Sequence, residues 1–196
     1  MADIASELRR YIAAQGQVVG PEFLRVDGFL NHRIDPSFVV LAAQGIAQAF
    51  AGAGITCVLT AEAAGNVLAY EVARQVGARA LYAKKGQAVT LGPALTRTIR
   101  SPTKGVPVQL CLAREYLGPG ERVLIVDDFL YQGTTSAALA EMALEAGATL
   151  VGFAFVIEKR FAQGREALAR FGVPIVSLVA IAGLDPHHNR IVFAEG

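Results

Sequence analysis

Residues 123–135 read Val-Leu-Ile-Val-Asp-Asp-Phe-Leu-Tyr-Gln-Gly-Thr-Thr, and this stretch decides the fold. Its four leading aliphatic residues are typical of a parallel strand that is buried on both faces. Asp127 and Asp128 follow at the carboxyl end of the strand, which is where ligands bind in open α/β sheets. The sequence therefore predicts a strand over 123–126 and a ligand-binding turn directly after it.

That turn has the features of a phosphate site. Gly133 permits a tight turn, and the hydroxyls of Thr134 and Thr135 precede an apolar helical pattern. A helix N-terminus offers free N–H groups and a positive dipole, so donors for a phosphate lie beside acceptors for sugar hydroxyls or a cation. The local pattern fits a sugar phosphate about as well as an ordinary strand–helix connection. P-loops and dinucleotide folds are excluded, because neither of their glycine patterns occurs.

Outward from this stretch, strand and helix patterns alternate from Gly54 onward. Strands are predicted over 55–60, 79–83, 106–113, 123–126, 150–157 and 175–181, and helices over 4–14, 36–50, 65–76, 134–146 and 165–170. Such alternation predicts an α/β fold with a mostly parallel, twisted sheet flanked by helices. We expect residues 1–196 to form a single domain, with residues 1–35 and about 182–196 as a small cap over the carboxyl ends of the strands.

Composition narrows the classes of function. The net charge of +1 gives no electrostatic case for binding nucleic acid, so the expected partner is a small molecule. The mean hydropathy is +0.41, yet the apolar runs are too short to cross a bilayer and no signal peptide is visible. Cys57 and Cys111 lie inside apolar strand patterns, which is typical of reduced core thiols in a cytoplasmic protein.

The connection over 84–105 is basic and contains no Asp or Glu. It holds Lys84, Lys85 and three further cations, together with several Gly and Pro residues. Long connections in compact domains are usually functional. We interpret it as an anion-binding lid over 85–104, with a solvated hairpin as the alternative.

The order strand, acidic pair, Gly-Thr-Thr resembles the ribose-5-phosphate loop of type I phosphoribosyltransferases. Two further segments, 23–36 and 156–165, are similar to those of the xanthine phosphoribosyltransferases in this family, and the similarity runs collinearly over nearly the whole chain. The resemblance implies purine salvage, in which xanthine and 5-phosphoribosyl 1-pyrophosphate (PRPP) give XMP and pyrophosphate. It also implies the type I phosphoribosyltransferase fold with the cap on the purine side, Mg²⁺ bound with PRPP, a cytoplasmic location and a homodimer.

The resemblance assigns a role to each part of the site. It implies that Asp127 and Asp128 serve the ribose and the cationic transition state, and that they are possible Mg²⁺ contacts through PRPP. The 5′-phosphate is expected at Tyr131, Gln132, Gly133, Thr134 and Thr135. The pyrophosphate is expected at Glu62, Ala63, Ala64, Gly65, Lys84 and Lys85. The purine is expected at Leu24, Asn31, Lys159 and Phe129.

The chain departs from the family pattern at two of these places. The family has hydroxyls where this chain has Ala63 and Ala64, and its xanthine-specific members favour Asn-Gly-Gln-Ala where this chain has Gln132-Gly-Thr-Thr. The alternatives are therefore a guanine/hypoxanthine or adenine phosphoribosyltransferase, or a regulator of the same fold that senses PRPP. The last would need a DNA-binding domain, for which the N-terminal segment is too short.

Overall fold

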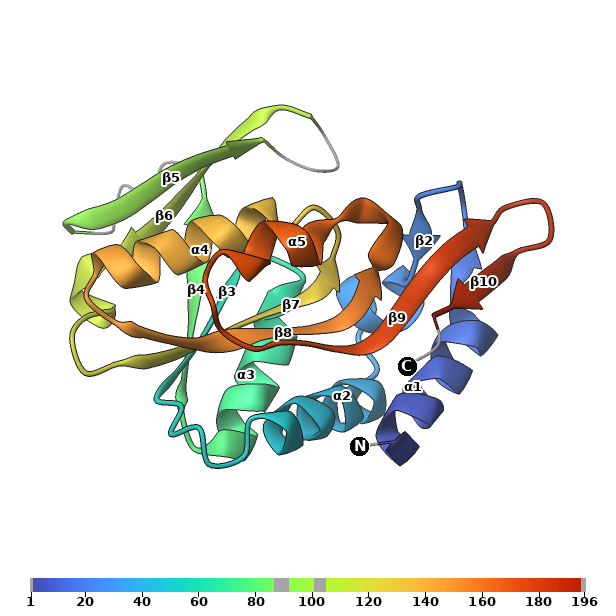
Figure 1. Ribbon diagram of the computed structural model, residues 1–196, viewed down its shortest axis with the longest axis horizontal. Helices are drawn as coiled ribbons and strands as arrows, with labels where there is room; N and C mark the ends of the chain where they lie inside the picture. Colours follow the sequence, from blue (N-terminus) through green and yellow to red (C-terminus); the bar gives the residue numbers. More distant parts are fainter. Residues whose placement is uncertain (1, 87–91, 101–104, 195–196) are drawn as a thin grey trace.

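A computed structural model describes residues 2–86, 92–100 and 105–194. An eight-stranded sheet with the order β10-β9-β8-β7-β3-β4-β6-β5 forms its centre (Figure 1). The strands are β3 (Cys57–Ala61), β4 (Arg79–Lys85), β5 (Ala94–Arg100), β6 (Pro107–Ala113), β7 (Arg122–Leu130), β8 (Thr149–Lys159), β9 (Ile175–Asp185) and β10 (Arg190–Phe193). The helices are α1 (Ala2–Gln15), α2 (Pro36–Ala49), α3 (Gly65–Val76), α4 (Thr134–Glu145) and α5 (Gly164–Ala169).

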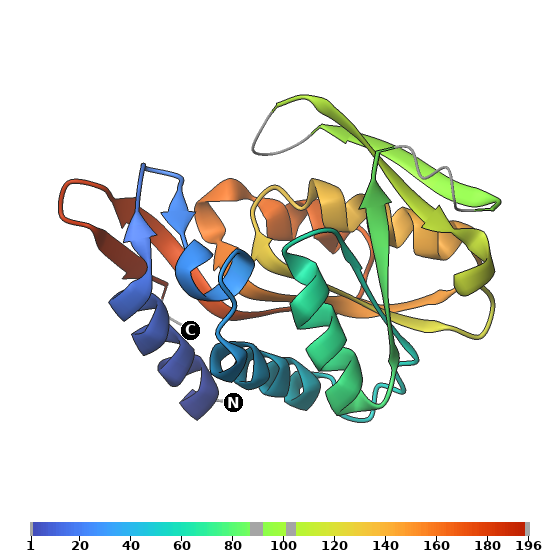
Figure 2. The ribbon, with the colours of Figure 1, turned by 180° about the vertical axis from the view of Figure 1, so that it is seen from behind.

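The centre of the sheet is parallel, as predicted. β7 pairs in parallel with β3 and with β8, and the parallel pairing continues to β4 on one side and β9 on the other. Side chains alternate along β7, since Leu124 and Val126 face α2 and α3 while Val123 and Ile125 face α4 and α5. Figures 1 and 2 show the two pairs of helices on opposite faces of the sheet. Both faces of β7 are therefore buried, which explains its continuous aliphatic run.

The edges of the sheet contain two features that the predicted strands did not include. The strand expected over 175–181 continues to Asp185 and turns back as the antiparallel β10, so the tail extends the sheet with a hairpin. Part of the connection over 84–105, interpreted as a lid, is the strand β5, which pairs with β6 from Ala94 to Arg100. This arm extends past α4 (Figure 1). The rest of the proposed lid, residues 87–91 and 101–104, lies outside the described residues.

The N-terminal segment contributes two elements beside the carboxyl ends of the strands. β1 (Gln17–Val18) and β2 (Leu24–Arg25) form a short antiparallel hairpin, and a π-helical turn follows over Asp27–Asn31. The backbone N–H of Val18 donates to Asn189 Oδ1 at 2.7 Å, which connects this hairpin to the turn between β9 and β10. The N- and C-terminal segments thus contact each other.

Local sequence signals place α2 and α3 well. The side chain of Asp35 accepts from the N–H of Ser37 at 2.9 Å, and Pro36 occupies the first helical position. α3 covers the predicted range, 65–76, and ends at Gly77, whose φ of 71° suits glycine. Within the described residues, no helix is long and apolar enough to cross a membrane.

Candidate active site

The acidic pair, Asp127 and Asp128, lies near the C-terminal end of strand β7. The strand runs on to Leu130, four residues beyond the predicted end, so Asp127 and Asp128 are strand residues, and their carboxyl groups interact with each other. Asp127 is half-buried and Asp128 is 9% exposed. Burial and the neighbouring Asp128 carboxylate raise the pKa of Asp127 well above its ordinary value, with the charge of Lys85 acting in the opposite direction. Burial and the like charge of Asp128 therefore both act against ionisation of Asp127.

The turn predicted to bind pyrophosphate meets this pair at Gly65. A Cβ on Gly65 would lie 2.0 Å from Thr60 Oγ1 and 3.1 Å from Asp127 Oδ1, so only glycine allows this approach. The Glu62 carboxylate accepts from the backbone N–H of Lys85 at 2.6 Å, which ties the turn to the end of β4. Thr60 Oγ1 is fully buried and has no hydrogen-bond partner among the described residues. The structure thus brings Gly65, Lys85 and Asp127 together.

The other residues predicted to bind pyrophosphate lie in the same turn and at the end of β4. Ala63 is exposed and Ala64 is half-buried, and both precede the N-terminus of α3. The Glu62 carboxylate is engaged with Lys85, so Glu62 serves as an acceptor that shapes the turn. Lys84 is half-buried in β4, next to Lys85. Backbone N–H groups and lysine ammoniums are the anion-binding groups that this region offers.

The loop predicted to bind the 5′-phosphate begins at Tyr131 and leads into α4. Gly133 has a φ of 72°, and a Cβ there would lie 2.9 Å from the carbonyl oxygen of Gly164. No described side chain caps the first turn of α4, which starts at Thr134. Glycine is required for the turn, and the first N–H groups of the helix keep their capacity to donate to an anion.

Three of the four predicted purine residues gather beside the acidic pair. Asn31 Nδ2 donates to Asp128 Oδ2 at 3.1 Å, although the two residues are far apart in the chain. Lys159 Nζ lies 5.1 Å from the ring centroid of Phe129. Burial lowers the pKa of Lys159, while the charges of Glu22 and Asp128 act in the opposite direction. The side chain of Leu24 is buried in the core, so any contact that it makes with a ligand would have to involve its backbone or an edge of the side chain.

Two further residues contact Lys159 and were not among the predicted site residues. Glu22 accepts a hydrogen bond from Tyr131 OH through its carboxylate and one from Lys159 Nζ through its carbonyl. Phe23 is 52% exposed and has its ring 5.8 Å from Lys159 Nζ. The one available signal was the segment 23–36, which begins at Phe23 and directly follows Glu22, since the partners of both residues lie more than a hundred residues away.

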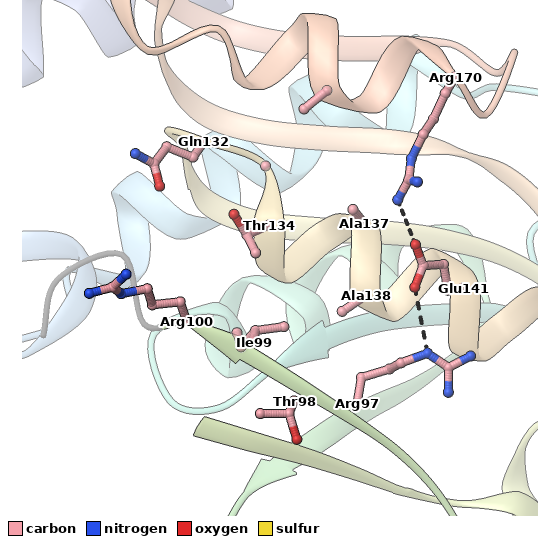
Figure 3. A pocket seen from close by; sticks show the side chains of 12 residues that line it. Arg97, Thr98, Ile99, Arg100, Gln132, Thr134, Ala137, Ala138, Glu141 and Arg170 are labelled. Atoms are coloured by element: carbon pink, nitrogen blue, oxygen red, sulfur yellow. Dashed lines mark hydrogen bonds and ion pairs between the residues drawn. The ribbon is translucent and has the colours of Figure 1, made fainter. Parts of the chain in front are cut away.

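A cavity of about 530 Å³ borders the loop that was predicted to bind the 5′-phosphate. It lies between β5 and the helices α4 and α5, and its lining includes Gln132, Gly133 and Thr134. Figure 3 shows Glu141 between the guanidinium groups of Arg97 and Arg170. Its carboxylate oxygens lie 3.5 Å from Arg97 Nε and 2.5 Å from an Arg170 guanidinium nitrogen. The acidic pair and the predicted purine residues do not line this cavity.

The fold and this arrangement define a class of protein. The sequence profile of the phosphoribosyl transferase domain matches residues 39–182, and the chain belongs to that family of pentosyl-transferring enzymes. It is 42% identical to the xanthine phosphoribosyltransferase of Heliobacterium modesticaldum over 96% of this chain and 99% of that protein. It is 44% identical to that of Chloroflexus aurantiacus over 89% of this chain and 82% of that protein. The predicted resemblance is confirmed.

Solved structures confirm the fold class. The adenine phosphoribosyltransferase of Rhodothermus marinus superposes with a TM-score of 0.76, covering 92% of this chain and 100% of that chain, at 24% identity. At this identity the likeness concerns the fold alone. The base that this chain uses must be argued from the residues at its own site.

Proposed function

We propose that this protein transfers the phosphoribosyl group of PRPP to xanthine, forming XMP and releasing pyrophosphate. The observation that carries the proposal is the hydrogen bond between Asn31 and Asp128, because it joins a group suited to the purine edge to a group suited to the ribose. The names of the relatives support the same substrate. The reaction is expected in the cytoplasm, and a homodimer with a purine-side cap made from residues 1–35 and 182–196 is the family expectation.

Each group has a task in this reaction. The carboxylates of Asp127 and Asp128 would accept from ribose hydroxyls and stabilise positive charge that develops on the ribose ring. The turn at Gly65 with Lys84 and Lys85 would neutralise the departing pyrophosphate. The N–H groups of residues 131–135 would hold the 5′-phosphate.

The acidic pair also suits Mg²⁺ carried by PRPP. No cluster of three or more Asp, Glu, His or Cys side chains that could hold a metal occurs in the described part of the chain. Two adjacent carboxylates provide the oxygen ligands that suit a hydrated ion held mainly by substrate phosphates, and the charge of the ion would offset the repulsion between Asp127 and Asp128. Asp127 and Asp128 would hold the ion, which would supply charge neutralisation for the pyrophosphate.

The base preference follows from donors and acceptors. A carboxylate only accepts, so Asn31 must turn its amide nitrogen toward Asp128, and its second N–H can donate to the 2-oxo group of xanthine. Guanine carries a 2-amino donor there, and accepting from it with a flipped Asn31 would set the amide oxygen against the Asp128 carboxylate. Lys159 would donate to a 6-oxo group, which adenine lacks.

Pyrophosphate release with xanthine, guanine, hypoxanthine and adenine in turn tests the proposal. We expect xanthine to have the highest kcat/KM and adenine the lowest. Asn31→Ala should narrow the gap between xanthine and hypoxanthine, whereas Lys159→Ala should weaken both. Highest activity with adenine would show that Asn31 and Lys159 have been assigned wrongly.

A further inference from the structure

Glu22, in the loop of the β1–β2 hairpin, contacts two parts of the site at once. Tyr131 OH donates to its carboxylate oxygen Oε2 at 2.7 Å, and Lys159 Nζ donates to its backbone carbonyl at 2.6 Å. The three residues come from the hairpin, from the loop after β7 and from the end of β8. Within the described residues, Glu22 is the hydrogen-bond partner of both Tyr131 OH and Lys159 Nζ.

The surroundings of Lys159 make this contact unusual. Its ammonium lies 5.8 Å from the ring centroid of Phe23 and 5.1 Å from those of Phe129 and Tyr131. An ammonium has three N–H donors, and aromatic faces attract its charge without fixing the direction of those donors. The carbonyl of Glu22 is therefore the group that sets the direction in which Lys159 points.

The other contact of Glu22 fixes the phosphate loop. Tyr131 is the first residue of that loop, and the hydrogen bond to Glu22 raises the pKa of the Tyr131 phenol, so the hydroxyl remains a donor. Glu22 is itself exposed, so its charge stays solvated and carries little burial penalty. A movement of the loop on binding a phosphate would be passed through Tyr131 to Glu22, and from Glu22 to Lys159.

We propose that Glu22 is a positioning residue that couples the 5′-phosphate loop to the purine subsite, by holding Tyr131 with its carboxylate and Lys159 with its carbonyl. This proposal rests on the proposed function, which assigns the loop to the phosphate and Lys159 to the base. Its consequence is that occupancy of one subsite improves binding at the other. Binding couplings of this kind are reciprocal.

A set of variants separates this role from plain structural support. Glu22→Ala removes the carboxylate, Glu22→Gln keeps an acceptor for Tyr131 without the charge, and Tyr131→Phe removes the same hydrogen bond from the other side. Glu7→Ala is the matched control, since Glu7 is an exposed glutamate on α1. Each variant is used only if its Tm lies within about 2 °C of the parent.

Steady-state kinetics with the best purine give the first readout. Glu22→Ala should raise the KM of both the purine and PRPP about tenfold, as loss of a hydrogen bond to a charged group predicts, with little change in kcat. The double variant Glu22→Ala/Tyr131→Phe should be no worse for PRPP than either single variant, because both remove one hydrogen bond. Additive losses, or an unchanged KM for the purine, would overturn the coupling.

The pH profile gives a readout that structural support would not move. The charged or titratable groups that face Lys159 are Glu22, Asp128 and Tyr131. The charge of Glu22 favours the ammonium, so Glu22→Gln should move the alkaline limb of kcat/KM for the purine to lower pH while the KM for PRPP stays near the parent value. The same substrate is compared in both proteins, so its own ionisation cancels. An unmoved limb would contradict the role of Glu22.

A binding experiment distinguishes failure of the coupling from failure of the proposed function. The rate at which an amine-reactive reagent acylates Lys159 is measured by mass spectrometry with and without ribose 5-phosphate. We expect a change of about fivefold in the parent and in Glu7→Ala, the lower end of ordinary couplings, and none in Glu22→Ala. Binding of ribose 5-phosphate with the same response in Glu22→Ala would refute the coupling alone. No binding to the parent would refute the assignment of the loop, and the coupling with it.

Discussion

Replacing Arg165 should destabilise the protein strongly, because it partners a buried carboxylate. Glu158 is 2% exposed and accepts from Arg165 at 2.9 Å and 2.6 Å in a two-pronged pair. Arg165 also donates to the carbonyl of Ile175 and to Ser177, so it joins α5 and β8 to β9. Arg165→Met keeps most of the apolar stem and removes both hydrogen bonds from the guanidinium to the buried Glu158 carboxylate, which retains only the Ser177 hydrogen bond and the more distant charge of Arg160.

Breaking a buried pair from one side costs about 3–5 kcal/mol. We expect about 3 kcal/mol here, because the Arg165 side chain is 40% exposed and water screens part of the interaction. In a chain of this size that loss corresponds to a fall in Tm of about 6–12 °C. Urea denaturation at fixed protein concentration measures the free energy of unfolding directly.

The pH dependence of that loss has a defined sign. Burial alone would raise the pKa of Glu158, but the hydrogen bonds from Arg165 and Ser177 and the charge of Arg165 lower it below its ordinary value. A lowered carboxyl pKa in the folded state stabilises above the unfolded pKa of about 4.3, and this contribution disappears as the pH falls through the folded pKa. The difference between Arg165→Met and the parent should therefore shrink in acid.

Two comparisons make the result decisive. Arg170→Met removes an ion pair with Glu141 in which both side chains are well exposed, so it should cost less than about 1 kcal/mol. Glu158→Met/Arg165→Met removes both charges of the pair, including the buried carboxylate, and should be more stable than Arg165→Met. A loss below about 1 kcal/mol in Arg165→Met, or a double variant as unstable as the sum of the two single variants, would refute the reasoning.

Three further predictions concern the site and its surroundings. Asp127→Asn/Asp128→Asn should lower kcat/KM about 10²-fold or more, equivalent to about 2.7 kcal/mol, and near-parental turnover would contradict their role. Asp128→Asn removes a like charge beside Asp127 and should lower the pKa of Asp127. If catalysis needs ionised Asp127, the acid limb of the kcat/KM profile should then move to lower pH. An unmoved acid limb would argue against a need for ionised Asp127. Burial raises the pKa of Cys57 to about 12, so iodoacetamide at pH 8 should leave Cys57 intact until the chain is unfolded.

The elements that the sequence predicted best carry their signals locally. Asp35-Pro36 starts α2 and Gly77 ends α3, because a side-chain cap and a left-handed turn act on neighbouring residues. The β7 strand and its glycine turn were recognisable for the same reason, although the strand extends past the acidic pair. Its extension depends on pairing with β8 as far as Leu130, which only the folded sheet provides.

β5 was missed because a charged residue occupies an inward position. Burial alternates regularly along the strand, with Leu95 and Ile99 buried and Arg97 half-buried on the same side. Arg97 interrupts the apolar pattern, and among the described residues its charge pairs with Glu141 and Glu145 on α4. A basic segment interpreted as a lid can thus be a strand whose inward charge pairs with a helix residue 48 positions away in the chain, as in the contact of Arg97 with Glu145.

The base preference is the part of the function least visible in the fold. Proteins named for xanthine resemble this chain in sequence, and a protein named for adenine resembles it in backbone, so the scaffold accommodates either base. Discrimination must come from the few groups that meet the purine edge. Asn31 is oriented by Asp128 and Lys159 by Glu22, and neither orienting residue belongs to the same element as the residue that it orients. Changing specificity would therefore require changing these partners as well as Asn31 and Lys159, since a new side chain held in the old direction would present its donors to the wrong atoms.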